Sequence, residues 1–165
     1  MDYLWNAVKS LEYNARYISY YKERANTIKI IVNTITAILS SGSFAALACW
    51  DALPWLFSAL TFVSVVVQIA YQNSRVYQLL PYLPLLEKRL YALSSKAKKE
   101  FVKHCDDNEK HGRKIAMEFY EEFIQIENEL LGGEFHIPTI KSVEKKAETE
   151  TAMVIKEEFC IEDKE

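Results

Sequence analysis

The feature that most constrains this chain is a long apolar stretch from Ile30 to Ser74 that carries one charged residue, Asp51. The uncharged runs on either side, residues 30–50 and 52–74, are each long enough to cross a bilayer, which takes about 20 helical residues. A soluble hairpin of two such helices would have to bury nearly its whole circumference, and a chain of 165 residues offers too little other protein for that. The stretch therefore predicts a transmembrane hairpin.

The turn between the two predicted spans holds a helix cap and two aromatic anchors. The carboxylate of Asp51 is placed to cap the second span, and Pro54 follows in its first turn, where a missing N–H costs little. Trp50 and Trp55 flank the turn, as aromatic residues do at a membrane interface. An ion-binding role for Asp51 at the mouth of a conducting path is the alternative to plain capping.

Basic residues lie on the outer flanks of both predicted spans, and the turn has none. They outnumber acidic residues in 1–29 and 75–100, whereas acidic residues outnumber them in 101–133 and 134–165. Lys and Arg beside a span favour the cytoplasmic side, so we predict that both termini are cytoplasmic. This charge also suits anionic lipid headgroups, and it gives no separate reason to expect nucleic acid as a partner.

Helical periodicity outside the apolar stretch predicts an all-α chain in four parts. We expect a cytosolic N-terminal helix in 1–29, the hairpin in 30–74 with spans at about 30–50 and 53–74, a cytosolic helical pair in 75–133 and an acidic tail in 134–165. The N-terminal helix and the pair are predicted to pack as one bundle. The tail reads as a weakly ordered helix or a disordered docking segment, with Ser142 as a cap.

Three apolar stripes at helical spacing mark the bundle. The stripe of the first helix is Leu4, Val8, Leu11, Ala15 and Ile18. We expect it to pack against the later helices, and an oligomer seam and an interfacial amphipathic helix are the alternatives. The stripes of the helical pair are Leu85, Leu86, Leu90, Leu93, Ala97 and Phe101, then Ile115, Phe119, Phe123, Ile126 and Leu130.

Glycine and proline mark the ends of these helices. Pro81 and Pro84 predict either a kink or a break with a restart after the second span. Gly132 and Gly133 predict the end of the second helix of the pair.

Each predicted span carries a stripe of uncharged polar residues on one helical face. In chain order the residues are Asn33, Thr36, Ser40, Ser43, Ser58, Thr61, Ser64, Gln68 and Gln72. Lipid does not solvate such groups, so the stripes either hydrogen-bond between helices or line a water-filled path enclosed by several chains. Small residues in the first span permit close helix contact, and these are Ser41, Gly42, Ala45 and Ala46.

The sequence carries no recognised catalytic or cofactor motif. It has no phosphate-binding loop, dinucleotide glycine pattern, zinc cysteine pair or nucleophile elbow. The cluster of His104, Cys105, Asp106, Asp107 and His111 has metal-ligand side chains without a metal-site spacing, so a polar turn between helices is the simpler interpretation. We expect no catalytic residue, no metal, no cofactor and no enzyme activity.

Residues 12–17 read Glu-Tyr-Asn-Ala-Arg-Tyr, and the closing helix contains Glu118-Phe119-Tyr120. With an N-terminal helix, two close spans and a helical pair, the chain resembles the SLATT family of small bacterial membrane proteins over residues 5–131. The resemblance implies a pore-forming or membrane-disrupting effector of a prokaryotic antiviral system. Such effectors lie in the bacterial inner membrane and stay inactive until infection, and they are often encoded with nucleotide second-messenger synthases or other sensors.

The expected partners are the lipid bilayer, further copies of the chain, and a nucleotide second messenger or cytosolic sensor protein. The candidate nucleotide-binding residues among the cytosolic helices are Arg16, Lys22, Arg24, Arg89 and Arg113. A non-conducting membrane adaptor that docks a cytosolic partner is the alternative function, and a phage-type holin is a third.

Overall fold

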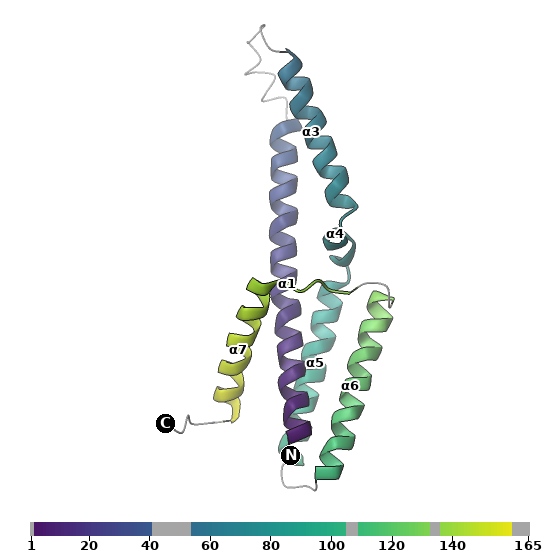
Figure 1. The fold of residues 1–165 in the computed structure, drawn as a ribbon, viewed down its shortest axis with the longest axis vertical. Coiled ribbons are helices and arrows are strands. Elements are labelled where there is room, and N and C mark those ends of the chain that lie inside the picture. Colours follow the sequence, from purple (N-terminus) through teal and green to yellow (C-terminus); the bar gives the residue numbers. More distant parts are fainter. Residues whose placement is uncertain (1, 41–53, 105–108, 133–135, 160–165) are drawn as a thin grey trace. The chain divides into compact units, whose positions relative to one another are not determined.

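The computed structural model describes residues 2–40, 54–104, 109–132 and 136–159. For Ser40 and residues 54–58 it describes the backbone and not the side chains. These residues are helical apart from short connections, which confirms the all-α prediction. The helices, labelled in Figure 1, are α1 (Asp2–Ser40), α3 (Pro54–Gln72), α4 (Arg75–Leu79), α5 (Leu83–Lys103), α6 (Glu109–Leu131) and α7 (Lys141–Phe159).

The chain divides into two compact units. Unit 1 comprises Met1–Lys22 and Tyr82–Glu165, and unit 2 comprises Glu23–Pro81. The helix α1 runs unbroken from Asp2 to Ser40 and contributes to both units. No proline interrupts the sequence on the way into the apolar stretch.

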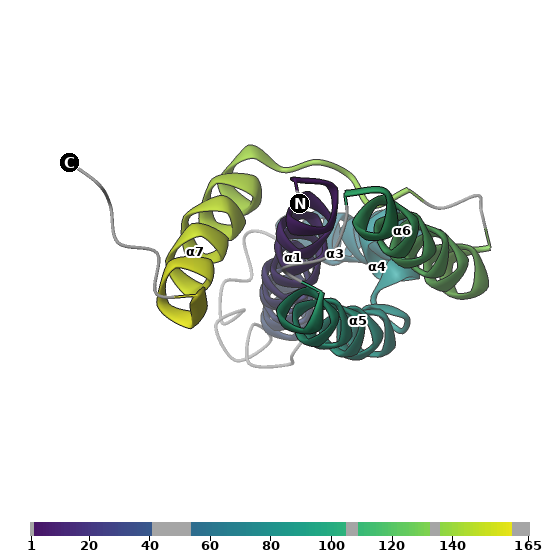
Figure 2. The ribbon, with the colours of Figure 1, turned by 90° about the horizontal axis from the view of Figure 1, so that it is seen from below.

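Unit 1 is a helical bundle in which α7 lies on one side of the first part of α1, and α5 and α6 lie on the other (Figures 1 and 2). The predicted stripe of α1, from Leu4 to Ile18, is at most 4% exposed at each of its five positions. The prediction that this stripe packs against later helices is confirmed. Since the chain's own helices bury it, it does not serve as an oligomer seam.

The buried faces of α5 and α6 differ in part from their predicted stripes. Leu85 is 46% exposed, and Leu83 takes the buried position instead. On α6 the buried face includes Gly112 and Ala116 as well as the predicted Phe119. A methyl group added at Gly112 would lie 3.8 Å from Cβ of Leu4, an ordinary van der Waals contact, so this buried position of α6 faces α1. Counting only large apolar residues misses such positions.

The ends of the helices follow the proline and glycine signals. Of the two outcomes predicted for Pro81 and Pro84, the break occurs: α3 ends at Gln72, the short α4 follows, and α5 restarts with Pro84 in its first turn. At the other end of the pair, Gly132 has φ +66°, a left-handed conformation that glycine adopts without strain and that commonly ends a helix.

Of the two alternatives predicted for the C-terminal tail, the structure has the helix. Residues 141–159 form the 19-residue helix α7. The helix buries one side chain per step of four, and these are Val143, Ala147, Thr151 and Ile155. Ser142 lies inside its first turn. An alanine and a threonine interrupt the apolar pattern, which hides this face from a search for large residues.

Unit 2 contains the rest of α1 together with α3 and α4. The helix α3 begins at Pro54, as predicted for the second span, and Ser74 caps α4 by accepting the N–H of Tyr77 at 3.3 Å. Over the residues that the structure describes, no helix is both long and apolar enough to cross a membrane. The predicted first span continues into residues 41–50, which lie outside the described residues, as does Asp51.

Candidate functional site

Unit 2 exposes most of its large apolar side chains. Those of the second part of α1 and of α3 that are exposed are Ile30, Ile31, Ile35, Ile38, Phe62, Val63, Val65, Val66, Val67 and Ile69. The most exposed are Phe62 at 70% and Ile30 at 65%. Extended apolar surfaces are uncommon on soluble monomers and mark contact with a membrane, a partner or a ligand.

Three polar side chains of unit 2 are covered instead. The hydroxyl of Thr36 on α1 donates to Oε1 of Gln68 on α3 at 3.1 Å, and both residues are half-buried. Ser64 is 1% exposed, and its hydroxyl donates to the carbonyl oxygen of Thr61 at 2.8 Å. Where α1 meets α3, unit 2 therefore pairs polar groups while isoleucines and valines are exposed, which is unlike the pattern of a protein in water.

The remaining residues of the predicted polar stripes take no part in the Thr36–Gln68 hydrogen bond. Asn33 and Gln72 are exposed. Ser40 and Ser58 lie on α1 and α3, but their side chains are outside the described set. Ser43 and the predicted helix-contact residues Ser41, Gly42, Ala45 and Ala46 also fall outside the described residues.

A second site lies in unit 1 around Glu12, whose side chain is 3% exposed. Its carboxylate accepts from Nε of Arg16 at 2.9 Å, from the hydroxyl of Ser94 at 2.7 Å and from Nζ of Lys98 at 3.0 Å. Two cations and one hydroxyl from α1 and α5 therefore satisfy one buried carboxylate, as a buried charge requires.

The same two cations also reach α7. Nη1 of Arg16 lies 2.9 Å from a carboxylate oxygen of Glu150, and Nζ of Lys98 lies 2.7 Å from one of Glu158. Each cation therefore bridges the buried carboxylate of Glu12 and an exposed carboxylate of α7. We call Glu12, Arg16, Lys98, Glu150 and Glu158 the Glu12 network. It joins α1, α5 and α7.

The network sets the ionisation of its central acid. Burial by itself raises the pKa of Glu12, but the hydrogen bonds from Ser94 and Lys98 and the charges of Lys98 and Arg16 outweigh it. The net pKa of Glu12 therefore lies below its ordinary value, and Glu12 is ionised at neutral pH.

Sequence reasoning missed the roles of Glu12, Ser94 and Lys98. The available signal is positional: Glu12 lies four residues after the buried Val8, and Ser94 lies four residues after the buried Leu90. An acid and a hydroxyl that fall on buried helical faces require partners there, and their coincidence on two helices predicts a buried polar contact.

A cavity of about 260 Å³ lies in unit 1 between α1, α6 and the connection that leads to α7. Its walls include Tyr13, Phe123, Glu127, His136 and Glu144. Burial raises the pKa of Glu127, and the charge of His136 opposes that rise only in part. The cavity therefore holds a carboxyl group whose pKa lies above its ordinary value.

The structure gives the candidate nucleotide-binding cations separate neighbours. Arg16 belongs to the Glu12 network, Lys22 pairs with Glu87, and Arg89 lies 2.6 Å from Glu129. The guanidinium carbon of Arg113 lies 5.4 Å from the ring centroid of Tyr3. The fifth candidate, Arg24, is exposed and belongs to unit 2.

The histidines of the proposed polar turn lie near each other. The rings of His104 and His111 meet edge to face at 5.1 Å. Within the described parts of the chain, no group of three or more His, Cys, Asp or Glu side chains is placed to hold a metal ion, and residues 105–108 lie outside those parts.

Comparison of the chain with protein-family models, with curated proteins and with solved structures found no match. The resemblance to the SLATT family therefore stays a prediction from the sequence.

Proposed function

We propose that unit 2 is the membrane anchor of a two-span, multi-pass protein of the bacterial inner membrane. The observation that carries the proposal is the reversed polarity of this unit, with isoleucines, valines and Phe62 outside and the Thr36–Gln68 hydrogen bond inside. Apolar side chains face lipid at low cost, whereas polar groups in a membrane are best satisfied between helices. The proposed spans are residues 30–50 and 53–74, so each extends beyond the described side chains.

The three cysteines provide a direct test of this topology. With both termini cytoplasmic, Cys49 lies at the outer tip, and Cys105 and Cys160 lie inside. Single-cysteine variants are made by replacing the other two cysteines with serine. A membrane-impermeant maleimide applied to intact cells should label the variant that keeps Cys49 and spare the other two until the cells are lysed. Labelling of all three, or none, in intact cells would contradict the hairpin.

Within this anchor we propose an oligomeric, pore-forming effector of a prokaryotic antiviral system, held inactive until a signal arrives. The support is the resemblance of residues 5–131 and the placement of Asn33 and Gln72, which are polar, exposed and on the proposed spans. Polar groups exposed on a membrane helix require water or another chain to solvate them. A water-filled path between protomers would solvate these groups. The proposed action is therefore permeabilisation of the membrane rather than catalysis.

The test is membrane depolarisation in bacteria that express the chain under tight induction. Asn33→Leu/Gln72→Leu should abolish depolarisation at equal membrane content, because it removes the exposed polar groups. The matched control is Thr36→Val/Gln68→Leu, which removes polar groups already paired within the unit and should leave conduction in place. Equal activity of both doubles would contradict a pathway lined by Asn33 and Gln72.

One observation favours a second function, a non-conducting membrane adaptor. Thr36 and Gln68 satisfy each other within unit 2, so at this position the polar stripes need no water-filled path. An adaptor would give no depolarisation at confirmed membrane expression, and cross-linking in cells would then capture a cytosolic partner on unit 1. The proposed signal, a nucleotide second messenger or a cytosolic sensor, would act on unit 1 in either case.

A further inference from the structure

The helix α7 contacts the rest of unit 1 through few large apolar side chains. Of its four buried side chains, only Val143 and Ile155 are large and apolar. At its last residue, the ring of Phe159 meets the rings of Trp5 at 5.1 Å and Phe101 at 5.5 Å. The hydroxyl of Thr151 is buried and has no hydrogen-bond partner in the described part of the chain. An unpartnered buried hydroxyl costs about 1–3 kcal/mol, so Thr151 opposes the docking that its neighbours favour.

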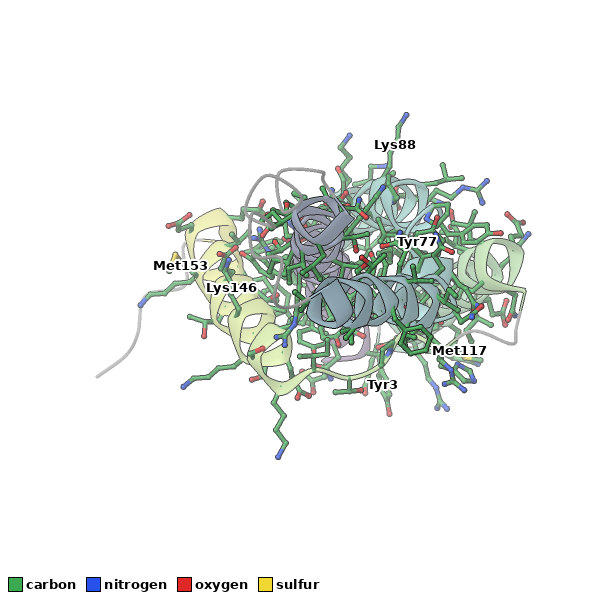
Figure 3. All side chains as sticks on the ribbon, turned by 90° about the horizontal axis from the view of Figure 1, so that it is seen from above. Tyr3, Tyr77, Lys88, Met117, Lys146 and Met153 are labelled. Atoms are coloured by element: carbon green, nitrogen blue, oxygen red, sulfur yellow. The ribbon has the colours of Figure 1, made fainter. Side chains whose placement is uncertain are left out.

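An open groove runs between α1 and α7, with a volume of about 790 Å³. Its walls are mainly apolar and include Trp5 and Tyr13 from α1 and Ala152 and Met153 from α7. Met153 and Lys146 mark α7 in Figure 3. Open space along a helix contact removes dispersion contacts that a closed interface would make, and it gives water access to the contact.

Three polar contacts also hold α7 against α1 and α5. Two are the ion pairs of Glu150 and Glu158 in the Glu12 network, and the side chains of these acids are 37% and 46% exposed. A third is Nζ of Lys146, which lies 3.9 Å from the ring centroid of Tyr20. Half-exposed pairs of this kind are individually weak, and salt screens them.

The Glu12 network lowers the electrostatic free-energy cost of releasing α7. When α7 leaves, Arg16 and Lys98 keep Glu12 as their partner, so no buried charge loses its counter-charge. Glu150 and Glu158 pass from partial exposure into water. The side-chain hydroxyl of Thr151 gains water as a partner.

Two hydrogen bonds hold the connection that leads into α7. The hydroxyl of Tyr17 donates to the carbonyl oxygen of Pro138 at 2.7 Å and accepts the N–H of Ile140 at 2.9 Å. These bonds fix the connection to α1 just before α7 begins at Lys141. The helix beyond this point can detach while its base stays attached.

We propose that α7 is a releasable latch: it undocks from α1 and α5 as a unit while α1, α5 and α6 stay packed, and its docked form holds the protein inactive. The second clause rests on the function proposed above. The first clause stands on the structure of unit 1 alone, so the two are tested separately.

Undocking is measured by hydrogen exchange on the full chain. Glu150→Gln/Glu158→Gln removes both ion pairs of α7. Glu148→Gln/Glu157→Gln is the matched control, since it removes the same charge from acids that have no ion-pair partner among the described residues. The first double should speed exchange in 141–159 about tenfold with α5 and α6 unchanged, and the control should not.

Salt gives an independent measurement on the unmodified protein. Raising NaCl from about 0.05 M to about 0.5 M should speed exchange in α7, and this effect should shrink in Glu150→Gln/Glu158→Gln. Unchanged protection of α7 in both experiments, or loss of protection in α5 and α6 together with α7, would overturn the latch.

Inhibition is measured by depolarisation in cells. Glu150→Gln/Glu158→Gln should depolarise at lower expression than the unmodified chain or the control double. If α7 is released and depolarisation of an active chain does not change, the inhibitory role is wrong. If no variant depolarises and Cys49 is not labelled from outside, the membrane function is wrong, and hydrogen exchange still decides whether α7 undocks.

Discussion

The two units of this chain solve opposite burial problems. Unit 1 encloses leucines, alanines and Phe119 and places charged side chains on its surface, with Glu12 as its one buried ion among the described residues. Unit 2 exposes isoleucines and valines and turns Ser64, Thr36 and Gln68 inward. The same helical geometry serves both. Under the membrane function proposed for unit 2, the surroundings of each helix pair account for which face carries apolar residues.

The contrast between the units would fail if lysine at an exposed apolar position had the same effect on membrane retention in both. Val66→Lys in unit 2 should reduce membrane insertion, because a lysine near the centre of a span costs about 2.5–3.5 kcal/mol. Ile124→Lys in unit 1 changes a side chain of similar exposure and should alter stability by less than about 0.5 kcal/mol. Alkaline extraction of membranes followed by immunoblotting measures the membrane retention of both variants, which Ile124→Lys should leave unchanged. Equal membrane retention of the two variants would remove the case for a lipid-facing unit 2.

The buried ion of unit 1 should be the largest single polar contribution to that unit. Glu12→Ala should cost about 2–3 kcal/mol, below the full range for a broken buried pair, because Arg16 and Lys98 retain Glu150 and Glu158. Glu157→Ala, at an exposed acid of α7, is the control and should stay within about 0.5 kcal/mol. Hydrogen exchange of α1 and α5 measures the change. A Glu12→Ala variant as protected as the control would show that the network contributes little.

Acid should weaken unit 1 through the same residue. The pKa of folded Glu12 lies below its ordinary value of 4.5, so its ionic contribution is fully present above about pH 4.5 and is lost as the pH falls through the folded pKa. Thermal unfolding between about pH 6 and pH 3 should show a loss that Glu12→Gln reduces. Glu100, Glu129 and Glu150 also have lowered pKa values and add to the remaining slope. An unchanged slope in Glu12→Gln would exclude Glu12 as a source.

The smallest expected effect is the hydrogen bond inside unit 2. A double-mutant cycle with Thr36→Val and Gln68→Leu should give a coupling of about 0.6 kcal/mol, typical of polar pairs between membrane helices. The cycle of Asn33→Leu with Gln68→Leu is the control and should give no coupling, since Asn33 is exposed and is not the partner of Gln68. Unfolding in detergent measures both cycles. A coupling near zero in the first would mean that the pair does not hold α1 against α3.

Local patterns in the sequence were sufficient for the buried stripe of α1 and for the end of α6. The stripe from Leu4 to Ile18 and the stop at Gly132 depend on neighbours within one or two helical turns. At Pro81 and Pro84 the sequence marked an interruption and left a kink and a break open, and the structure has the break. Periodicity and backbone restriction report such features directly. The absence of a proline before residue 40 is consistent with the unbroken helix α1, and Pro54, predicted for the first turn of the second span, begins α3.

Only the tertiary structure decided which polar groups are paired and whether the tail is docked. Ser94 lies 82 residues from Glu12, and Glu150 lies 134 residues from Arg16, so no local pattern connects them. The docking of α7 depends on a face made of Val143, Ala147, Thr151 and Ile155, which is too small and too polar to be recognised without the surface it meets. Burial is a property of two surfaces together, and the sequence displays each of them separately.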